Sequence, residues 1–242
     1  ALHRGEFLAT DDLLAREWYS LTIVWLLIAG AILRWHASLH DKQLELIVSA
    51  ASLALIAVAV IGQLTRYNPM LTGQSVGEGL IFNELMKGYL ITALLCAALY
   101  HWNKRQLHER VRQAIGMGAG LLAFAYISLM VRSYFHGAVL TYGATTQGEW
   151  YSYSVAWLIF GVGLLAGGLW LRSLPLRAAS AAIILLTVAK VFLFDLAALE
   201  GILRALSFIG LGGTLIAIGY VYQRLLFAPR QEPERPAAED AA

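Results

Sequence analysis

Four stretches of this chain contain at least 19 consecutive residues without a charged side chain. A helix rises about 1.5 Å per residue, so about 17 to 25 apolar residues are enough to cross the hydrocarbon core of a bilayer. The four uncharged runs are residues 46–64, 113–131, 150–171 and 205–223. They predict helices that cross a membrane, and they exclude water as the main solvent of the chain.

The composition of the whole chain leads to the same conclusion. Hydrophobic residues make up 59% of the 242 positions and charged residues only 14%, whereas a soluble domain carries about 25% charged residues. We therefore predict an all-α, polytopic transmembrane helix bundle of about seven spans. The predicted spans are residues 18–35, 44–64, 80–101, 113–134, 150–171, 176–194 and 203–223. Charged residues in the third and sixth spans favour shorter, tilted or partly interfacial helices there.

The distribution of basic residues predicts the orientation of these spans. Lys and Arg are enriched in the cytoplasmic loops of membrane proteins. Eleven of them flank one set of loops: Arg34, Lys42, Lys104, Arg105, Arg110, Arg112, Arg172, Arg177, Arg224, Arg230 and Arg235. The alternate set has four: Arg4, Arg16, Arg66 and Arg204. We therefore expect a bacterial inner-membrane protein with its N-terminus outside and its C-terminus in the cytoplasm.

Three segments follow from this arrangement. Residues 1–16 are expected to be periplasmic or interfacial, residues 17–226 to form the membrane domain, and residues 227–242 to be a disordered cytoplasmic tail, because the tail is Pro-rich and charged. The chain begins with Ala1 and has no signal-peptide pattern, which favours a piece of a longer precursor, although removal of an initiator Met gives the same start. The single cysteine, Cys96, excludes a disulfide framework within the chain.

An internal repeat is visible in the sequence. Residues 17–27 (EWYSLTIVWLL) recur as residues 149–159 (EWYSYSVAWLI), with six of eleven positions identical. The same offset carries the second predicted span onto the sixth without a gap. The two repeat copies are placed near residues 17–101 and 149–226. Since the motifs begin the first and fifth spans, which are an even number of spans apart, both copies are expected to enter the membrane in the same direction, as parallel repeats. Chance similarity among apolar residues is the alternative.

Two blocks resemble the C-terminal part of a large family of uncharacterised bacterial multi-pass membrane proteins. They are EWYSYSVAWLIFGVGLLAGGLWLRS at 149–173 and KVFLFDLAALEGILRALSFIGLGGTLIAIGYVYQRLL at 190–226; RSYFHG at 132–137 is also similar. Members of that family are longer and have more spans, so the resemblance implies a fragment of a many-helix inner-membrane protein. It implies no known reaction, cofactor or catalytic residue.

Ionisable residues near the outer ends of the spans are the candidate functional residues, because charge inside a bilayer is costly and usually serves a purpose. The principal candidates are predicted to form one cluster: Arg132, His136, Glu149, Lys190, Asp195 and Arg204. Secondary candidates at comparable depth are Glu17, Arg66, Asn83, Glu84 and Lys87. Converging, they would line an outward-facing polar crevice suited to an anionic or sugar-bearing envelope substrate.

A structural network of ion pairs is the alternative interpretation of the same residues. Glu84 and Lys87 are spaced i,i+3, Glu200 and Arg204 are spaced i,i+4, and Lys190 could extend outward toward Asp195. His136 is the candidate proton carrier, since imidazole titrates near neutral pH, although a hydrogen-bonded structural histidine is the simpler reading. Pairs of glycines spaced GxxxG, Gly116 with Gly120 and Gly163 with Gly167, predict close helix packing.

Nucleotide chemistry finds no motif in the sequence. There is no P-loop and no GxGxxG before a βαβ unit. We expect no metal site and no cofactor. The expected partners are membrane lipids, and either the remainder of a longer chain or other membrane subunits; nucleic acid is not expected. Three functions remain open: an enzyme or binding protein for an envelope lipid or glycan, a transporter core, and a structural or assembly subunit. Charge collected on one side favours the first.

Overall fold

The computed structural model describes residues 16–32, 42–77, 79, 83–102, 109–195 and 202–226. The described residues are helical wherever they are regular, and their only β-type pairing is one isolated bridge between Ser75 and Val139. The residues predicted as a disordered tail, 227–242, lie outside the described part, as do Arg4 and Glu200. The all-helical class predicted from the sequence is confirmed for the described residues.

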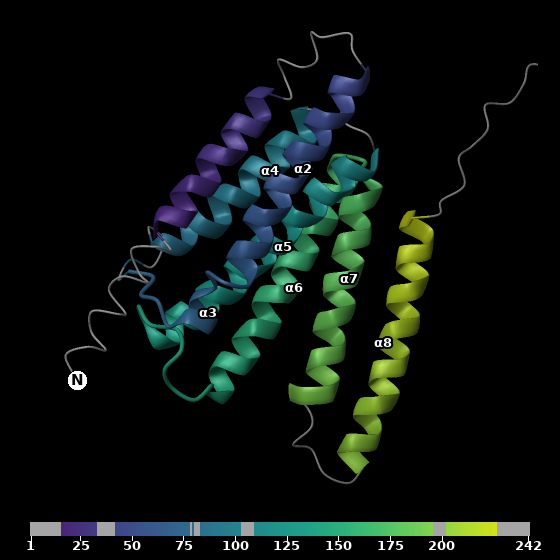
Figure 1. Cartoon of the computed structure of the whole chain (residues 1–242). Helices are drawn as coiled ribbons and strands as arrows, with labels where there is room; N and C mark the ends of the chain where they lie inside the picture. The colour runs from purple at the N-terminus through teal and green to yellow at the C-terminus, as the bar shows by residue number, and fades with distance from the viewer. Residues whose placement is uncertain are drawn as a thin grey trace, which may run out of the picture. The chain divides into compact units, whose positions relative to one another are not determined.

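The helices lie close to the predicted spans. The first described helix covers residues 16–32. The others follow in chain order: α2 (Lys42–Leu64), α3 (Pro69–Thr72), the π-helix η1 (Met86–Ile91), α4 (Thr92–Trp102), α5 (Glu109–His136), α6 (Gln147–Trp170), α7 (Leu174–Lys190), the π-helix η2 (Val191–Asp195) and α8 (Ile202–Leu226). Figure 1 shows this succession of long helices along the chain.

Three helices of the described part are long and apolar enough to cross a membrane: α5, α6 and the stretch Leu174–Asp195, which joins α7 to η2. Less than a third of the most apolar window of each is buried inside the protein. Apolar side chains such as Ile159 and Ile216 are 67% and 76% exposed. Lipid tails solvate such surfaces as well as a protein interior does, so the chain has the surface of a membrane protein. The other four spans stay predictions.

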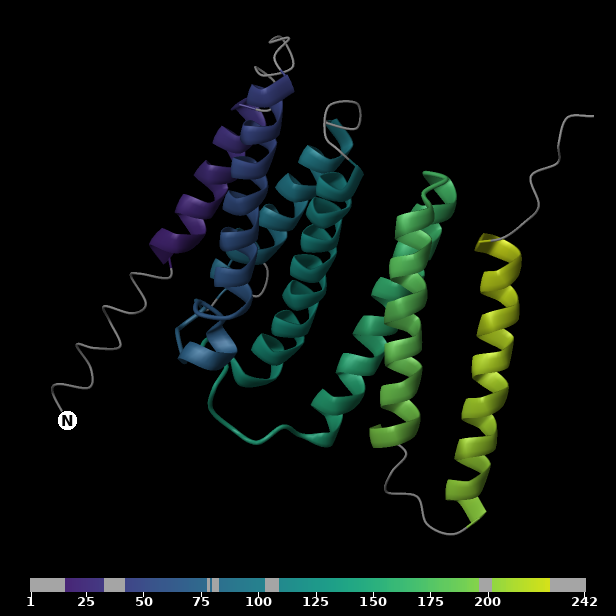
Figure 2. The ribbon, with the colours of Figure 1, turned by 45° about the vertical axis from the view of Figure 1, so that its right-hand side comes forward.

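The chain forms two compact units, Ala1–Trp157 and Leu158–Ala242. In the first unit, successive long helices alternate in direction, as Figures 1 and 2 show. Helix 16–32 and η1–α4 run parallel: Gly30 meets the side chain of Leu99, and Gly88 meets the ring of Tyr19, and both pairs are 69 residues apart. Helix α5 packs against α2, η1 and α4. The core of this unit includes Leu26, Leu85, Tyr89, Ile115 and Leu122, each at most 1% exposed.

The second unit consists of the end of α6 with α7, η2 and α8. The hydroxyl of Ser180 in α7 donates to the carbonyl of Gly161 at 2.7 Å, and it lies 2.7 Å from the hydroxyl of Tyr222 in α8. Gly161 itself lies against Ile184, where a Cβ atom would be 2.7 Å from the side chain. One small buried residue therefore ties the three helices together, as small residues do in membrane bundles.

The predicted glycine pairs contribute less than expected. Of the first pair, Gly116 lies against the ring of Tyr100, but Gly120 has no neighbour within 4 Å of a built Cβ. Of the second pair, Gly167 makes an ordinary contact with Leu176 and Gly163 makes none. The GxxxG spacing identified helices rich in small residues, but the closest approaches occur at Gly30, Gly62, Gly88, Gly161 and Gly168.

The connection after α2 contains structure that the apolar pattern does not reveal. Asn68 begins the short helix α3 by accepting a hydrogen bond from the backbone N–H of Met70 at 3.0 Å, and Pro69 occupies the first helical position, where its missing N–H costs nothing. Gly73 ends this helix in the left-handed conformation. The chain then reaches Ser75 and Val76, which pair with the connection between α5 and α6.

Candidate functional site

Arg132, one of the six principal candidates, lies about one turn before the end of α5 and is 6% exposed. Its guanidinium holds the connection that follows. Nε donates to the carbonyl of Leu140 at 3.0 Å, and Nη2 donates to the carbonyl of Gly143 at 3.0 Å. Nη1 donates to Thr145 Oγ1 at 3.2 Å. A planar guanidinium with five donors is suited to such a converging set of oxygen acceptors.

Glu149, in the first turn of α6, neutralises this guanidinium. Its side chain is fully buried, and Arg132 Nη1 donates to its Oε1 at 2.8 Å and its Oε2 at 3.0 Å. His136 Nε2 lies 2.8 Å from Oε2, and the hydroxyl of Tyr153 donates to Oε1 at 3.2 Å. We call Arg132, His136, Glu149 and Tyr153 the Arg132 cluster. The guanidinium of Arg132 and the carboxylate of Glu149 are thus paired in the protein interior. The side chains of His136 and Tyr153 make further contacts with the same carboxylate.

The local sequence explains why Glu149 points into this cluster. Thr146 precedes α6, and its hydroxyl accepts a hydrogen bond from the backbone N–H of Glu149 at 3.2 Å. Thr146 and Glu149 therefore have the spacing of a capping box, T-x-x-E. In a capping box the glutamate would reach back to the backbone, but here its carboxylate binds Arg132. Tyr153 follows Glu149 by one helical turn, so the two side chains lie on the same face of α6 and the hydroxyl of Tyr153 reaches the carboxylate.

Two glycines let the connection close over His136. Gly137 and Gly143 have φ angles of +73° and +89°, a region that other L-residues rarely adopt. A Cβ atom at Gly143 would lie 2.7 Å from His136 Nδ1. The connection is held on its other side by Val76, whose backbone N–H donates to the carbonyl of Ala138 at 2.8 Å. Leu140 and Val76 are each 1% exposed, so this segment belongs to the core of its unit.

Lys190 and Asp195 form a second pair, in the other compact unit. Lys190 Nζ donates to Asp195 Oδ1 at 2.7 Å, and the side chains are 8% and 4% exposed. The π-helix η2 begins directly after Lys190 and brings together residues that are five apart. The pairing expected of a structural network is confirmed here. Arg204 lies in α8, but its side chain is outside the described part. A single cluster of all six principal candidates stays a prediction.

The secondary candidates divide into a pair and several isolated positions. Glu84 Oε1 lies 3.2 Å from Lys87 Nζ, which confirms the i,i+3 pair, and 3.8 Å from Arg16 Nε. Asn83 accepts a hydrogen bond from the backbone N–H of Met86 at 3.1 Å, which helps to begin η1. Glu17 is exposed, and Arg66 is exposed with its guanidinium 5.8 Å from the ring centre of Tyr67.

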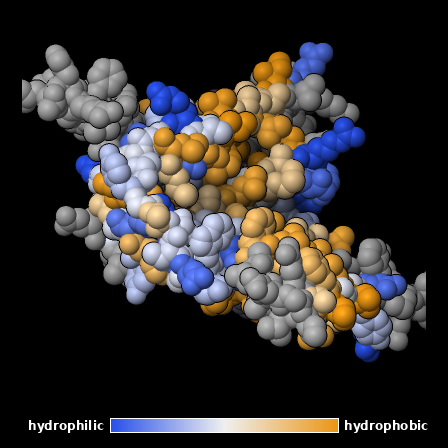
Figure 3. Space-filling model, turned by 90° about the horizontal axis from the view of Figure 1, so that it is seen from below, coloured by the Kyte–Doolittle hydropathy of each residue, from blue (hydrophilic) through white to orange (hydrophobic). Residues whose placement is uncertain are grey.

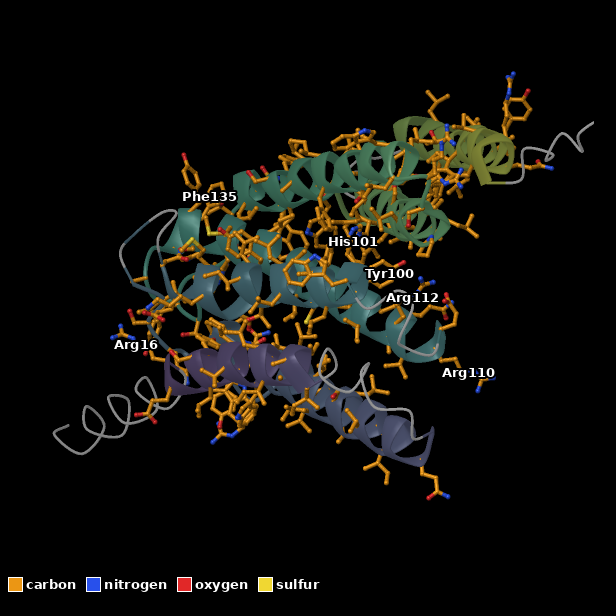
Figure 4. All side chains as sticks on the ribbon, turned by 90° about the horizontal axis from the view of Figure 1, so that it is seen from above. Arg16, Tyr100, His101, Arg110, Arg112 and Phe135 are labelled. Carbon is orange, nitrogen blue, oxygen red and sulfur yellow. The ribbon has the colours of Figure 1, made fainter. Side chains whose placement is uncertain are left out.

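Arginines lie at both ends of the first unit. Arg110 and Arg112 begin α5, and Arg112 lies over the ring of Tyr100, 5.4 Å from its centre. Figure 4 shows these residues with His101 at one end of α4 and α5, while Phe135 and Arg16 lie at the other end. Figure 3 views the end that carries the connection between α5 and α6, where hydrophilic and hydrophobic side chains both reach the surface.

An open pocket lies beside the Arg132 cluster, on another face of α5. Its volume is about 400 Å³, and almost all of its exposed lining is apolar. We call it the α5–α6 groove. It is lined by Tyr126, Ile127, Met130, Val131, Tyr134 and Phe135 of α5 and Ser152 of α6. Sequence reasoning missed the groove, because its lining residues belong to two predicted spans and look like ordinary lipid-facing positions.

Metal ligands do not gather in the described part of the chain, where no three His, Cys, Asp or Glu side chains lie close enough to share an ion. The Arg132 cluster has one histidine and one carboxylate, and Arg132 and Tyr153 occupy the remaining sides of that carboxylate.

Comparison with known proteins gives one match. A family model described as "Predicted membrane protein (DUF2339)" matches residues 3–225. No curated protein and no solved structure matches the chain.

Proposed function

Because this chain belongs to the family described as "Predicted membrane protein (DUF2339)", we propose that it is a multi-pass protein of the bacterial inner membrane that binds an envelope lipid. The family and the three apolar helices establish a membrane protein. Seven spans, an outside N-terminus and a location in the inner membrane belong to the proposal. They are supported by the alternating directions of the helices within each unit (Figures 1 and 2) and by the basic residues at the start of α5.

The α5–α6 groove is the observation that carries lipid binding. It lies on two helices that are apolar and long enough to cross the membrane, so its mouth opens toward lipid chains. Its wall consists of Ile127, Met130 and Val131 with the rings of Tyr126, Tyr134 and Phe135. An acyl chain fits such a wall, because van der Waals packing decides which groups meet inside a membrane.

The same end of the helices offers polar groups for a lipid headgroup. Ser152 lies in the groove wall, and residues 141–146 of the connection between α5 and α6 are exposed. Tyr134 is 70% exposed, and tyrosine is enriched where a membrane meets water because one end of its side chain is apolar and the other polar. We propose that the acyl chain lies in the groove and that its headgroup meets the hydroxyl and backbone groups of this connection.

A substitution that fills the α5–α6 groove with a large side chain tests lipid binding there. Val131→Trp adds a large ring to its wall, while Leu121→Trp adds the same ring to a lipid-facing position of α5 that is 54% exposed and outside the groove. Both variants are purified in mild detergent, and bound lipids are counted by native mass spectrometry. We expect the Val131 variant to lose one tightly bound lipid that the wild type and the Leu121 variant retain.

Equal lipid content in all three proteins would contradict lipid binding in the groove. A thermal unfolding curve for each variant separates loss of lipid from loss of fold. The mass of the lost lipid identifies the headgroup, which distinguishes a phospholipid from a glycan-bearing lipid.

A structural or assembly subunit is the second candidate function. The Arg132 cluster supports it, because Glu149 is fully buried and its contacts with Arg132, His136 and Tyr153 join α5 to α6 rather than face a substrate. Unchanged lipid content in the groove variant, with normal unfolding, would favour this candidate.

A further inference from the structure

Gln63 lies on the buried face of α2. Ile56, Ala59 and Val60 precede it at helical spacing and are at most 7% exposed, while Gln63 itself is fully buried. Neither Oε1 nor Nε2 of its amide has a hydrogen-bond partner among the described residues. A primary amide offers two donors and an oxygen acceptor, and buried polar groups are nearly always satisfied by protein or by ordered water.

Two tyrosine hydroxyls bind carbonyls in this turn of α2 and in the turn that follows it. The hydroxyl of Tyr89 donates to the carbonyl of Gln63 at 2.6 Å, and the hydroxyl of Tyr19 donates to the carbonyl of Tyr67 at 2.7 Å. The two rings lie 6.1 Å apart, and both side chains are at most 2% exposed. Each hydroxyl uses its proton on a carbonyl of α2 or of the turn that follows it, so each oxygen is still able to accept a hydrogen bond.

Two buried threonines lie one turn further along the neighbouring helices. Thr22 follows Tyr19 and Thr92 follows Tyr89 by three residues, and both threonines are fully buried. Helix 16–32 and η1–α4 run parallel, with contacting residues 69 apart in sequence, so Thr22 lies within one residue of the level of Thr92. Their hydroxyls donate to carbonyls of their own helices, those of Trp18 and Lys87. The interior of this unit therefore has a polar layer.

The polar layer is bounded on one side by apolar residues. Leu26, Ile56 and Cys96 lie further along the same three helices, toward the end that carries Trp102, and each is at most 3% exposed. The π-helix η1 is part of the layer itself, since Tyr89 is one of its residues. A π-helical turn inserts an extra residue into the helix and often marks a functional position. The polar layer therefore ends at buried apolar residues on the side of Trp102, and it does not extend through the whole unit.

We propose that the amide of Gln63 holds internal water between helix 16–32, α2 and η1–α4, in a binding site formed with the hydroxyls of Tyr19 and Tyr89. Water is the ligand that matches the groups present, because it donates to Oε1 and accepts from Nε2 and can donate again to a tyrosine oxygen. Buried waters in proteins typically make about three such bonds to polar groups that have no other partner.

Hydroxyl-radical footprinting by X-ray radiolysis tests this site. Radicals formed from bound water oxidise the side chains beside it, and oxidation is located by mass spectrometry. An impermeant radical scavenger suppresses labelling from bulk water. We expect the scavenger to remove oxidation of Tyr134 and Tyr142, which are 70% and 71% exposed, and to leave oxidation of Tyr89 and Tyr19 in place.

The variant Gln63→Leu removes the amide and keeps a side chain of similar volume, so oxidation of Tyr89 should be lost. Gln113→Leu is the matched control, because Gln113 is exposed on α5 and binds Glu109; it should label like the wild type. Absence of scavenger-resistant oxidation at Tyr89 in the wild-type protein would overturn the proposal without any variant. Oxidation that persists unchanged in a folded Gln63→Leu protein would overturn it equally.

Discussion

At the scale of single residues, Arg132 and Glu149 depend on each other. Each is nearly or fully buried, and each meets its opposite charge at 2.8 Å. Removing one partner of a buried pair leaves an uncompensated charge, whereas replacing both with apolar residues is often nearly neutral. A structural cluster and a substrate-binding cluster therefore respond differently to single and double substitution.

We predict that Arg132→Met lowers the free energy of unfolding by about 3 to 5 kcal/mol, because it strands the carboxylate of Glu149. The double variant Arg132→Met with Glu149→Leu should recover most of that loss. Thermal unfolding in detergent and abundance in membranes measure both effects. Arg66→Met is the control: Arg66 is exposed, so its change should stay within about 0.5 kcal/mol. Single and double variants of equal, wild-type stability would contradict a structural cluster.

The sequence predicted part of this site. Pairs close in sequence, Glu84 with Lys87 and Lys190 with Asp195, follow from helical spacing and from the cost of an unpaired charge in a membrane. The three carbonyl and hydroxyl acceptors around Arg132 do not follow from spacing. They depend on the path of the chain from Gly137 to Thr146, which two left-handed glycines determine.

At the scale of elements, the helices were largely predictable. A bilayer requires every backbone group to be bonded within the helix, so an apolar run of sufficient length has few other conformations available. Predicted and observed ends differ by only a few residues, as for 113–134 against α5 (Glu109–His136). The π-helices η1 and η2 and the short helix α3 were not predicted, because they depend on packing and on caps such as Asn68 rather than on hydropathy.

The internal repeat is a prediction at this scale. Both EWYS segments lie in the first turns of their helices, but Glu17 is exposed and Glu149 is fully buried, so the two copies do not share their contacts. We predict that they share their depth. Leu27 and Ile159 are equivalent positions of the repeat and are 55% and 67% exposed. Spin labels on cysteines there, in a Cys96→Ala background, should report equal immersion in the bilayer by their oxygen and nickel accessibility. Labels on opposite leaflets would contradict a parallel repeat.

At the scale of the whole molecule, the orientation of the chain in the membrane decides which leaflet supplies the lipid proposed for the α5–α6 groove. An outside N-terminus would place the connection between α5 and α6 in the periplasm. It would place the loop at 102–112, with Lys104, Arg105, Arg110 and Arg112, in the cytoplasm, as the positive-inside rule predicts.

Two cysteines test the orientation. In a Cys96→Ala background, Gln147→Cys should react with a membrane-impermeant maleimide added to cells with a permeabilised outer membrane, and Gln106→Cys should react only after the inner membrane is opened. Both positions are polar in the wild type, and Gln147 is exposed at the start of α6. Labelling of Gln106→Cys in cells with an intact inner membrane would reverse the orientation.

The ion pair at the end of α5 also has a consequence for how the protein is made. Arg132 is synthesised 17 residues before Glu149, so in the proposed orientation, if α5 inserted alone, a guanidinium would be translocated before its counter-charge. A lone arginine at the centre of an inserting helix costs about 2.5 to 3.5 kcal/mol. Insertion of α5 together with the start of α6, as one hairpin leaving the translocon laterally, avoids this cost, because the pair then crosses as a neutral unit.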